Sequence, residues 1–369
     1  MWLTIPLIVA NVVALAMLWP RSNRVDAALA APGAIPPLVA ATILDANLVD
    51  CESTVSEALG AINCLELEAK LSNGSITTFQ QTVIGPLRLR INDRVYLTDL
   101  GQKADGSTQY GFYEYQREKP LLLLGAAFVI FAIAIGRRAG LQALVALALS
   151  IFVLVKFMLP AIVDGRNPLV VALVGASAVM FLALYLSHGI NVRTTSAAIG
   201  TVASLCLTGL VAWAAVRAAK FTGLTGDDAS YLRATSNNID LKGLLLAGVI
   251  IGALGVLDDV TVTQSSAVWE LHQANPELGF AGRYSAAMRI GRDHIASVVN
   301  TLVLAYAGAA LPLLLLFTQA GTPLAEVFNG EPVATEIVRM LAGSIGLIAA
   351  VPITTALTSI VVEFDRTAD

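Results

Sequence analysis

The chain has 369 residues, of which 56% are apolar and only 14% are charged. A soluble domain of this length could not bury so much apolar surface, so the composition indicates an integral membrane protein. The 23 basic and 27 acidic residues give a net charge of -4 and leave no basic tail, which argues against a nucleic-acid partner.

Eight apolar runs approach the length needed to cross roughly 30 Å of hydrocarbon. In chain order they are residues 2–19, 121–135, 141–159, 169–186, 197–216, 241–257, 295–317 and 337–362. The runs at 121 and 241 are short, so we expect their helices to extend into flanking polar residues. The sequence therefore predicts a mainly α-helical bundle of seven or eight spans in a lipid bilayer.

The first run, within residues 1–20, has two readings. The small residues Ala28-Leu29-Ala30 resemble a signal-peptide cleavage site. Arg21, Arg24 and Asp26 lie between the run and that site, however, and no cation precedes the run. We therefore favour an uncleaved transmembrane signal anchor, and either reading places the next region outside the cytoplasm.

Residues 34–119 have a different pattern from the rest of the chain. Apolar and polar side chains alternate in 64–71, 87–91 and 95–98, and the alternation is broken by Asn73-Gly74, Gly85-Pro86 and Asn92-Asp93. Period-two alternation between such pairs is typical of short antiparallel strands joined by tight turns. We expect a small extracytoplasmic β-barrel or sandwich, OB-like, followed by a seven-helix transmembrane domain (120–362) and a cytoplasmic tail (363–369).

Two of the three cysteines, Cys51 and Cys64, fall inside this β-domain. A disulfide closing a loop of this size stabilises a fold by roughly 3 kcal/mol, and such bonds persist in oxidising compartments. We predict a Cys51–Cys64 disulfide, with two unpaired buried thiols as the alternative.

The polar residues most suggestive of function lie between residues 241 and 317. Ionisable side chains in or at the edge of a bilayer cost several kcal/mol unless they are paired or hydrated, so they are functional candidates. Helical spacing puts Asp259, Thr263, Ser266 and Glu270 on one face, which cannot face lipid. The predicted substrate or ion pathway comprises Asp258, Asp259, Thr263, Gln264, Arg289, Arg292, Asp293, His294 and Asn300.

Three interpretations of these residues stay open. Asp258 or Asp259 pairs with Arg289 or Arg292 and only locks two helices together, since arginine holds a carboxylate bidentately. Alternatively, the two aspartates bind a divalent cation with Asp293 and His294. In the third interpretation the same groups relay protons or coordinate a substrate in a transporter.

Common enzyme signatures are absent from the sequence. It contains no phosphate-binding loop, zinc-protease motif, serine elbow or dinucleotide fingerprint. Three histidines and three cysteines also leave little material for a catalytic triad. We therefore expect no enzymatic activity and no cofactor.

The order of residues in three segments resembles the YibE/F family of bacterial multi-spanning membrane proteins. These segments are the glycine-spaced run 243–264 with Asp258-Asp259, the motif Arg289-Ile-Gly-Arg292-Asp293-His294, and the run that starts at Asn300. The likeness covers nearly everything from about Val39 to the last helix, including the β-domain. It implies a multi-pass protein of the bacterial plasma (inner) membrane and a role for the charged motifs, but it names no substrate.

From these observations we expect a transporter or permease-like protein for a small solute or ion. The rival hypothesis is an envelope scaffold or assembly factor whose β-domain binds an extracytoplasmic protein while the charged helices only stabilise the bundle. The sequence leaves open whether the chain also forms a homo-oligomer.

Overall fold

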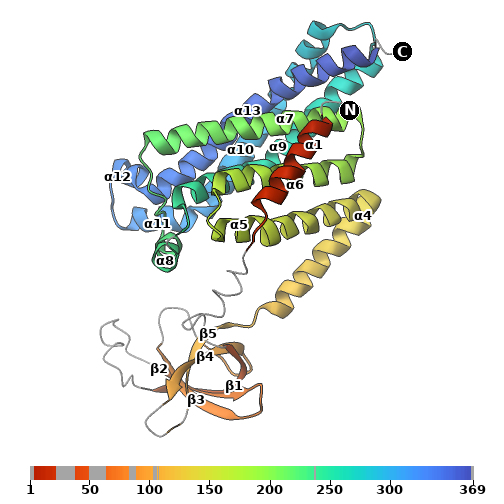
Figure 1. Ribbon diagram of the computed structural model, residues 1–369. Helices are drawn as coiled ribbons and strands as arrows, with labels where there is room; N and C mark the ends of the chain where they lie inside the picture. Colours follow the sequence, from red (N-terminus) through yellow and green to blue (C-terminus); the bar gives the residue numbers. More distant parts are fainter. Residues whose placement is uncertain are drawn as a thin grey trace. The chain divides into compact units, whose positions relative to one another are not determined.

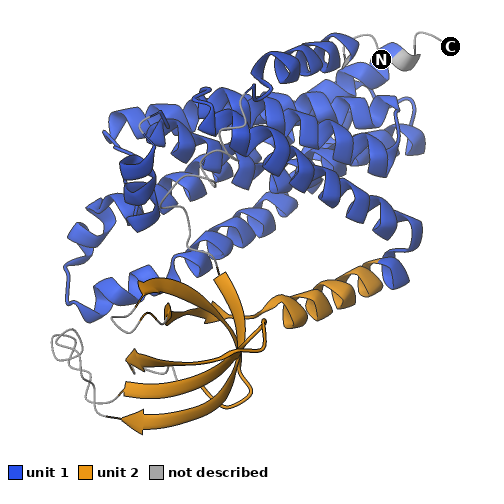
Figure 2. Cartoon of the chain, turned by 60° about the horizontal axis from the view of Figure 1, so that its bottom comes forward, with its two compact units in different colours: residues 1–25, 133–369 blue, residues 26–132 orange. Residues whose placement is uncertain are grey.

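The computed structural model describes residues 4–21, 38–49, 64–82, 89–102, 106, 108–236 and 238–366. Figure 1 shows the chain, and Figure 2 shows its division into two compact units. The helical unit contains residues 1–25 and 133–369, and the β unit contains residues 26–132. The predicted β-domain, residues 34–119, falls inside the second unit.

The strands separate α1 from α4, and from α4 onward the helices follow one another with short connections. Their bounds are α1 (Thr4–Leu18), α4 (Glu118–Val153), a π-helical turn η1 (Leu154–Met158), α5 (Leu159–Val163), α6 (Pro168–His188), α7 (Val192–Ala218), α8 (Asp227–Thr235), α9 (Leu241–Ala274), α10 (Phe280–Ala309), α11 (Leu311–Gln319), α12 (Leu324–Asn329) and α13 (Glu331–Arg366). Asn167 and Asn191 start α6 and α7 by accepting hydrogen bonds from Val170 N and Thr194 N. These side chains satisfy backbone donors that the first helical turn leaves unpaired.

Five helices of the described chain are long and apolar enough to cross a membrane, and six if the bent pair α10 and α11 forms one span. The sequence predicted seven or eight spans, and two places account for the difference. The runs 121–135 and 141–159 are counted together as the 46-residue stretch Glu118–Val163, in which two helices meet at a kink at Arg137. The first run forms α1, a helix of only 15 residues. The protein is therefore a multi-pass membrane protein.

The β unit is a five-stranded antiparallel sheet. Its strands are β1 (Leu38–Val49), β2 (Cys64–Leu71), β3 (Ile76–Thr82), β4 (Arg94–Gln102) and β5 (Thr108–Tyr115). They lie in the order β3-β2-β1-β4-β5, so the sheet is open, with β3 and β5 at its edges. The expected closed barrel or sandwich is thus replaced by an open sheet.

The alternation of apolar and polar side chains in β2 gives the sheet one buried face. Leu65, Leu67 and Ala69 are buried, whereas Glu66 is exposed, because successive side chains of a strand point to opposite faces. Asn73-Gly74 joins β2 to β3, and Gly74 has a φ of 88°, which glycine adopts without strain. The alternation at 87–91 was misleading: its described residues, 89–91, lead into a turn in which Arg90 N donates to Asp93 Oδ2 at 2.7 Å.

Of the two cysteines in the predicted disulfide, the structure describes one. Cys64 is buried at the start of β2. Cys51 lies outside the described residues. The Cys51–Cys64 pairing therefore stays a prediction.

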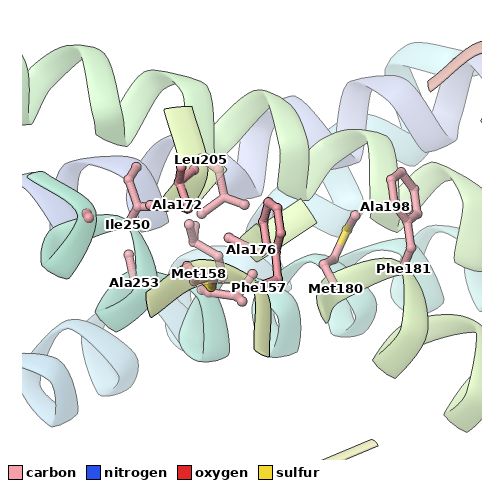
Figure 3. Close-up of a cluster of buried hydrophobic side chains, with 14 of the residues drawn as sticks. Phe157, Met158, Ala172, Ala176, Met180, Phe181, Ala198, Leu205, Ile250 and Ala253 are labelled. Atoms are coloured by element: carbon pink, nitrogen blue, oxygen red, sulfur yellow. The ribbon is translucent and has the colours of Figure 1, made fainter. Parts of the chain in front are cut away.

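The core of the helical unit forms where η1, α6, α7 and α9 meet (Figure 3). Phe157, Ala176, Leu205 and Ile250 are almost completely buried there. Gly175 on α6 packs directly against the Met158 side chain, which leaves no room for a Cβ atom. Lipid tails are as apolar as these side chains, so close packing, rather than escape from water, holds such helices together.

Contacts between distant residues fix the directions of the inner helices. Gly200 and Thr208 on α7 pack against Thr354 and Gly346 on α13, so these two helices are antiparallel. On α9, Gly248 lies near Arg339 and Gln264 contacts Thr355, so α9 and α13 run parallel. The three helices therefore share long interfaces, along which the candidate site lies.

Candidate functional site

The two aspartates of the predicted site occupy different environments on α9. Asp259 is exposed, whereas Asp258 is half-buried and its Oδ1 atom is fully buried without a hydrogen-bond partner among the described residues. Adjacent residues of a helix point about 100° apart, so the two carboxylates lie on different parts of the helix surface. Asp258 is therefore the more plausible member of an internal site.

Four of the predicted site residues on α10 point away from the helix interfaces. Arg289, Arg292, Asp293 and Asn300 are all exposed. The hydrogen bond found for Arg289 joins its Nη1 to Ser285 Oγ at 3.4 Å. The three ion pairs of the described chain are Arg117–Glu114, Arg283–Glu363 and Arg339–Glu336, so the expected pairing of Asp258 or Asp259 with Arg289 or Arg292 is not formed.

His294 is half-buried on α10, and its Nε2 atom has no hydrogen-bond partner in the described part of the chain. The described residues contain no group of three or more His, Cys, Asp or Glu side chains placed to hold a metal ion. A divalent-cation site made by Asp258, Asp259, Asp293 and His294 is therefore not supported. Helical geometry explains this, because these side chains emerge from α9 and α10 in several directions.

Gln264 is the predicted site residue that the structure places deepest in the bundle. Its Nε2 donates to Ala287 O on α10 at 2.9 Å and to Thr355 Oγ1 on α13 at 2.7 Å. Gly291 provides the space for this side chain, because a Cβ atom there would collide with Gln264 and Val351. One amide group thus joins three helices, while the neighbouring Thr263 is exposed.

Hydroxyl side chains extend this polar contact along α7, α9 and α13. The Thr201 and Thr261 hydroxyls lie 2.6 Å apart, and Ser265 Oγ donates to Arg193 O at 2.8 Å. Thr358 Oγ1 lies 3.2 Å from Ser265 Oγ. We call this set the polar seam; it consists of Thr201, Thr261, Gln264, Ser265, Thr355 and Thr358, all of which are buried.

Backbone carbonyls of the same helices accept further hydrogen bonds from the seam. Thr201 Oγ1 donates to Ala197 O at 3.0 Å and Thr355 Oγ1 to Val351 O at 2.6 Å. Such bonds to the i−4 carbonyl let hydroxyls sit in an apolar bundle without a large desolvation penalty. Thr261 Oγ1 also lies 3.1 Å from the backbone oxygen of Asp258, which connects the seam to the buried aspartate.

Two parts of this arrangement were missed in the sequence. Thr355 and Thr358 belong to the segment Thr354-Thr355-Ala356-Leu357-Thr358-Ser359, and its four hydroxyls inside an apolar run are a visible signal. Arg283 gave no such signal, yet among the described residues it is the largest side chain that is completely buried. It bonds to Leu278 O and Glu363 and lies 3.4 Å from Ser359 O, so it joins α10 to α13.

Comparison with known proteins identifies the family of the chain. The sequence profile of the YibE/F-like proteins matches residues 124–364, which is well over half of the chain. The chain belongs to the YibE/F-like family. No curated protein and no solved structure matches it.

The family match changes how the two units are interpreted. In this YibE/F-like protein the matched range contains α6, α7, α9, α10 and most of α13, and therefore the whole polar seam. The five strands end at Tyr115, before the match begins, so the expectation that the likeness includes the β-domain was too broad. The helical unit is the part that carries the family character.

Proposed function

We propose that the chain is a non-enzymatic transporter or permease-like protein that moves a small solute or ion through its helical unit. The observation that carries this proposal is the polar seam, a set of hydroxyl and amide side chains inside a bundle of membrane-length helices. Hydroxyl and amide side chains also hold packed membrane helices together. The seam, however, shares helix α9 with Asp258, and ionisable residues in membrane spans are rare and mark pathways or hydrated cavities.

In this proposal Asp258 carries the charge or proton of the transported species. Its buried Oδ1 lacks a described partner, and its backbone oxygen accepts from Thr261. The seam residues Thr261 and Gln264, farther along α9, provide neutral oxygen and nitrogen atoms for the same pathway. His294 has a buried, unpartnered Nε2 and is the second group suited to proton exchange.

The exposed predicted residues take a different role. Asp259, Thr263, Arg289, Arg292, Asp293 and Asn300 lie on outer faces of α9 and α10. Charged faces of this kind do not tolerate lipid, so we assign them to a hydrated entrance or to contact with another protein surface, including a second copy of the chain. We further propose a location in the bacterial plasma membrane, with the β unit outside the cytoplasm.

The test compares two carboxylates of α9. A strain lacking the protein is complemented with wild type, Asp258→Asn or Glu270→Gln, and cellular metals and metabolites are profiled without preselection. Glu270 lies on the same helix but is exposed, so it is the matched control. We expect Asp258→Asn to lose complementation and Glu270→Gln to keep it. Full complementation by Asp258→Asn at normal expression would refute the transport role of Asp258.

A second candidate function, an envelope scaffold, is favoured by a cavity of about 480 Å³ in the β unit. Its lining includes Glu66, Gln80, Gln109 and Tyr110, which come from β2, β3 and β5. Such side chains suit recognition of a polar partner. Filling the cavity with Gln80→Trp should leave a transporter functional but should abolish complementation by a scaffold.

A further inference from the structure

A second cavity lies at one end of the helical unit. Its lining does not include Asp258 or any residue of the polar seam. It has a volume of about 430 Å³ and is bounded by the start of α6, the end of α7 and the start of α9. All three helices are candidate membrane spans. Their ends mark the boundary between hydrocarbon and water, so the cavity opens at the membrane surface.

The charges that line this cavity are unbalanced. Arg217, Lys220 and Lys242 contribute three cations, whereas Asp240 is the only carboxylate of the lining. None of the three cations belongs to an ion pair of the described chain. Like charges around one cavity repel one another, so an anion placed between them would be stabilised.

Local helix structure explains Arg217, which lies in the last turn of α7, where the helix dipole favours a cation, but it does not explain the two lysines. Lys242 is in the first turn of α9, where the helix dipole disfavours a positive charge. Lys220 has a φ of 55°, a left-handed conformation in which glycine or asparagine is usual after a helix. Both positions are therefore less stable than alternatives without a cationic side chain, which favours a role in binding.

The remaining lining residues suit an anion with apolar neighbours. The Arg217 guanidinium lies 5.7 Å from the centre of the Trp213 ring, which holds this bidentate donor at the cavity wall. Asn167 adds a polar amide, and Leu169 and Leu246 add apolar surface. The N-termini of α6 and α9 contribute positive dipole ends.

We infer that this cavity binds a phosphate-bearing ligand at the membrane surface. Arginine and lysine together recognise phosphate through a bidentate fork and a point charge. At a membrane surface such a group comes from an anionic phospholipid headgroup or from soluble phosphate. The inference does not depend on the proposed transport function, because it uses no residue of the polar seam.

The test measures thermal unfolding of the full-length protein in a neutral detergent. Phosphatidylglycerol is compared with phosphatidylcholine, and inorganic phosphate with chloride at equal ionic strength. The variants are the double substitution Arg217→Gln with Lys242→Gln, and Arg233→Gln as control, because Arg233 is an exposed cation of α8 outside the cavity. We expect a rise of about 3 °C in wild type and control and none in the double variant.

The pattern of responses identifies the ligand source. A response to phosphatidylglycerol alone assigns the site to a phospholipid headgroup, and a response to inorganic phosphate assigns it to a soluble ligand. No response in the wild type, or an equal response in the double variant, overturns the inference. If the double variant does not fold, Asp240→Asn decides: removal of the only lining carboxylate should strengthen the response, and an unchanged or weaker response refutes the site.

Discussion

Replacing Arg283 should destabilise the contact between α10 and α13. The Arg283 side chain is completely buried, and it bonds to Leu278 O and to Glu363 and lies 3.4 Å from Ser359 O. Arg283→Met keeps most of the side-chain volume but removes every donor. Two carbonyl oxygens, one buried and one half-buried, then lose this donor, at about 1 kcal/mol each, and the charge-assisted bond is lost as well.

The bond to Glu363 contributes less than a fully buried ion pair would. The Glu363 side chain is 48% exposed, so water can solvate its carboxylate once Arg283 is gone. We therefore expect Arg283→Met to cost about 3 kcal/mol in total. The matched variant Glu363→Gln keeps an acceptor oxygen for Arg283 and should cost less than about 1 kcal/mol.

Reversible unfolding of the full chain in mixed detergent micelles, with increasing sodium dodecyl sulfate, measures both free energies of unfolding. The free energy of unfolding of Arg283→Met should be clearly lower than that of both Glu363→Gln and the wild type. Equal stability of Arg283→Met and wild type would show that the buried guanidinium contributes nothing net. Equal losses in both variants would show that the ion pair, rather than the carbonyl contacts, determines the effect.

Two further predictions concern packing and pH. Gly346→Ala should destabilise the helical unit by about 1–3 kcal/mol, because the added methyl group would collide with the Thr208 side chain. The control Gly255→Ala meets no atom within 4 Å and should be neutral or slightly stabilising. Similar effects of both substitutions in the same unfolding assay would contradict this prediction. In the β unit, hydrogen bonds from Arg117 and from the Tyr115 backbone lower the pKa of Glu114 below its ordinary 4.5. The ionised Glu114 therefore stabilises the folded chain above pH 4.5, and this contribution is lost as the pH falls through the folded-state pKa. An NMR titration should find this low pKa and a return toward 4.5 in Arg117→Gln; an unchanged pKa in the variant would refute the stated cause.

Sequence patterns predicted local features well where one physical rule controls them. Hydropathy located every apolar stretch that became a long helix, and period-two alternation located β2 at Cys64–Leu71. The same rules did not decide how the apolar runs divide into membrane spans or whether the sheet closes into a barrel. Hydropathy cannot show that the chain bends at Arg137, and alternation cannot show whether the edge strands β3 and β5 pair.

The candidate site divides in the same way. Helical spacing put Asp259, Thr263 and Glu270 on one face, but the predicted site still grouped Asp258 with Asp259, and only the structure separated the two. The sequence also marked Gln264 as a polar residue of the site. It could not show that Gln264 turns inward to Thr355, which is 91 residues away. Nor could it show that Arg289, Arg292 and Asp293 of α10 turn outward whereas Arg283 turns inward.

The sequence by itself determined that the chain is a multi-pass membrane protein, that it carries a strand-rich segment, and that its unusual polar residues concentrate around α9. Only the tertiary structure decided which of these residues meet, because the period of a helix fixes the residues on one face but not the helix against which that face packs. The polar seam joins α7, α9 and α13, and the cation-lined cavity joins the ends of α6, α7 and α9. Both depend on packing between segments that are distant along the chain.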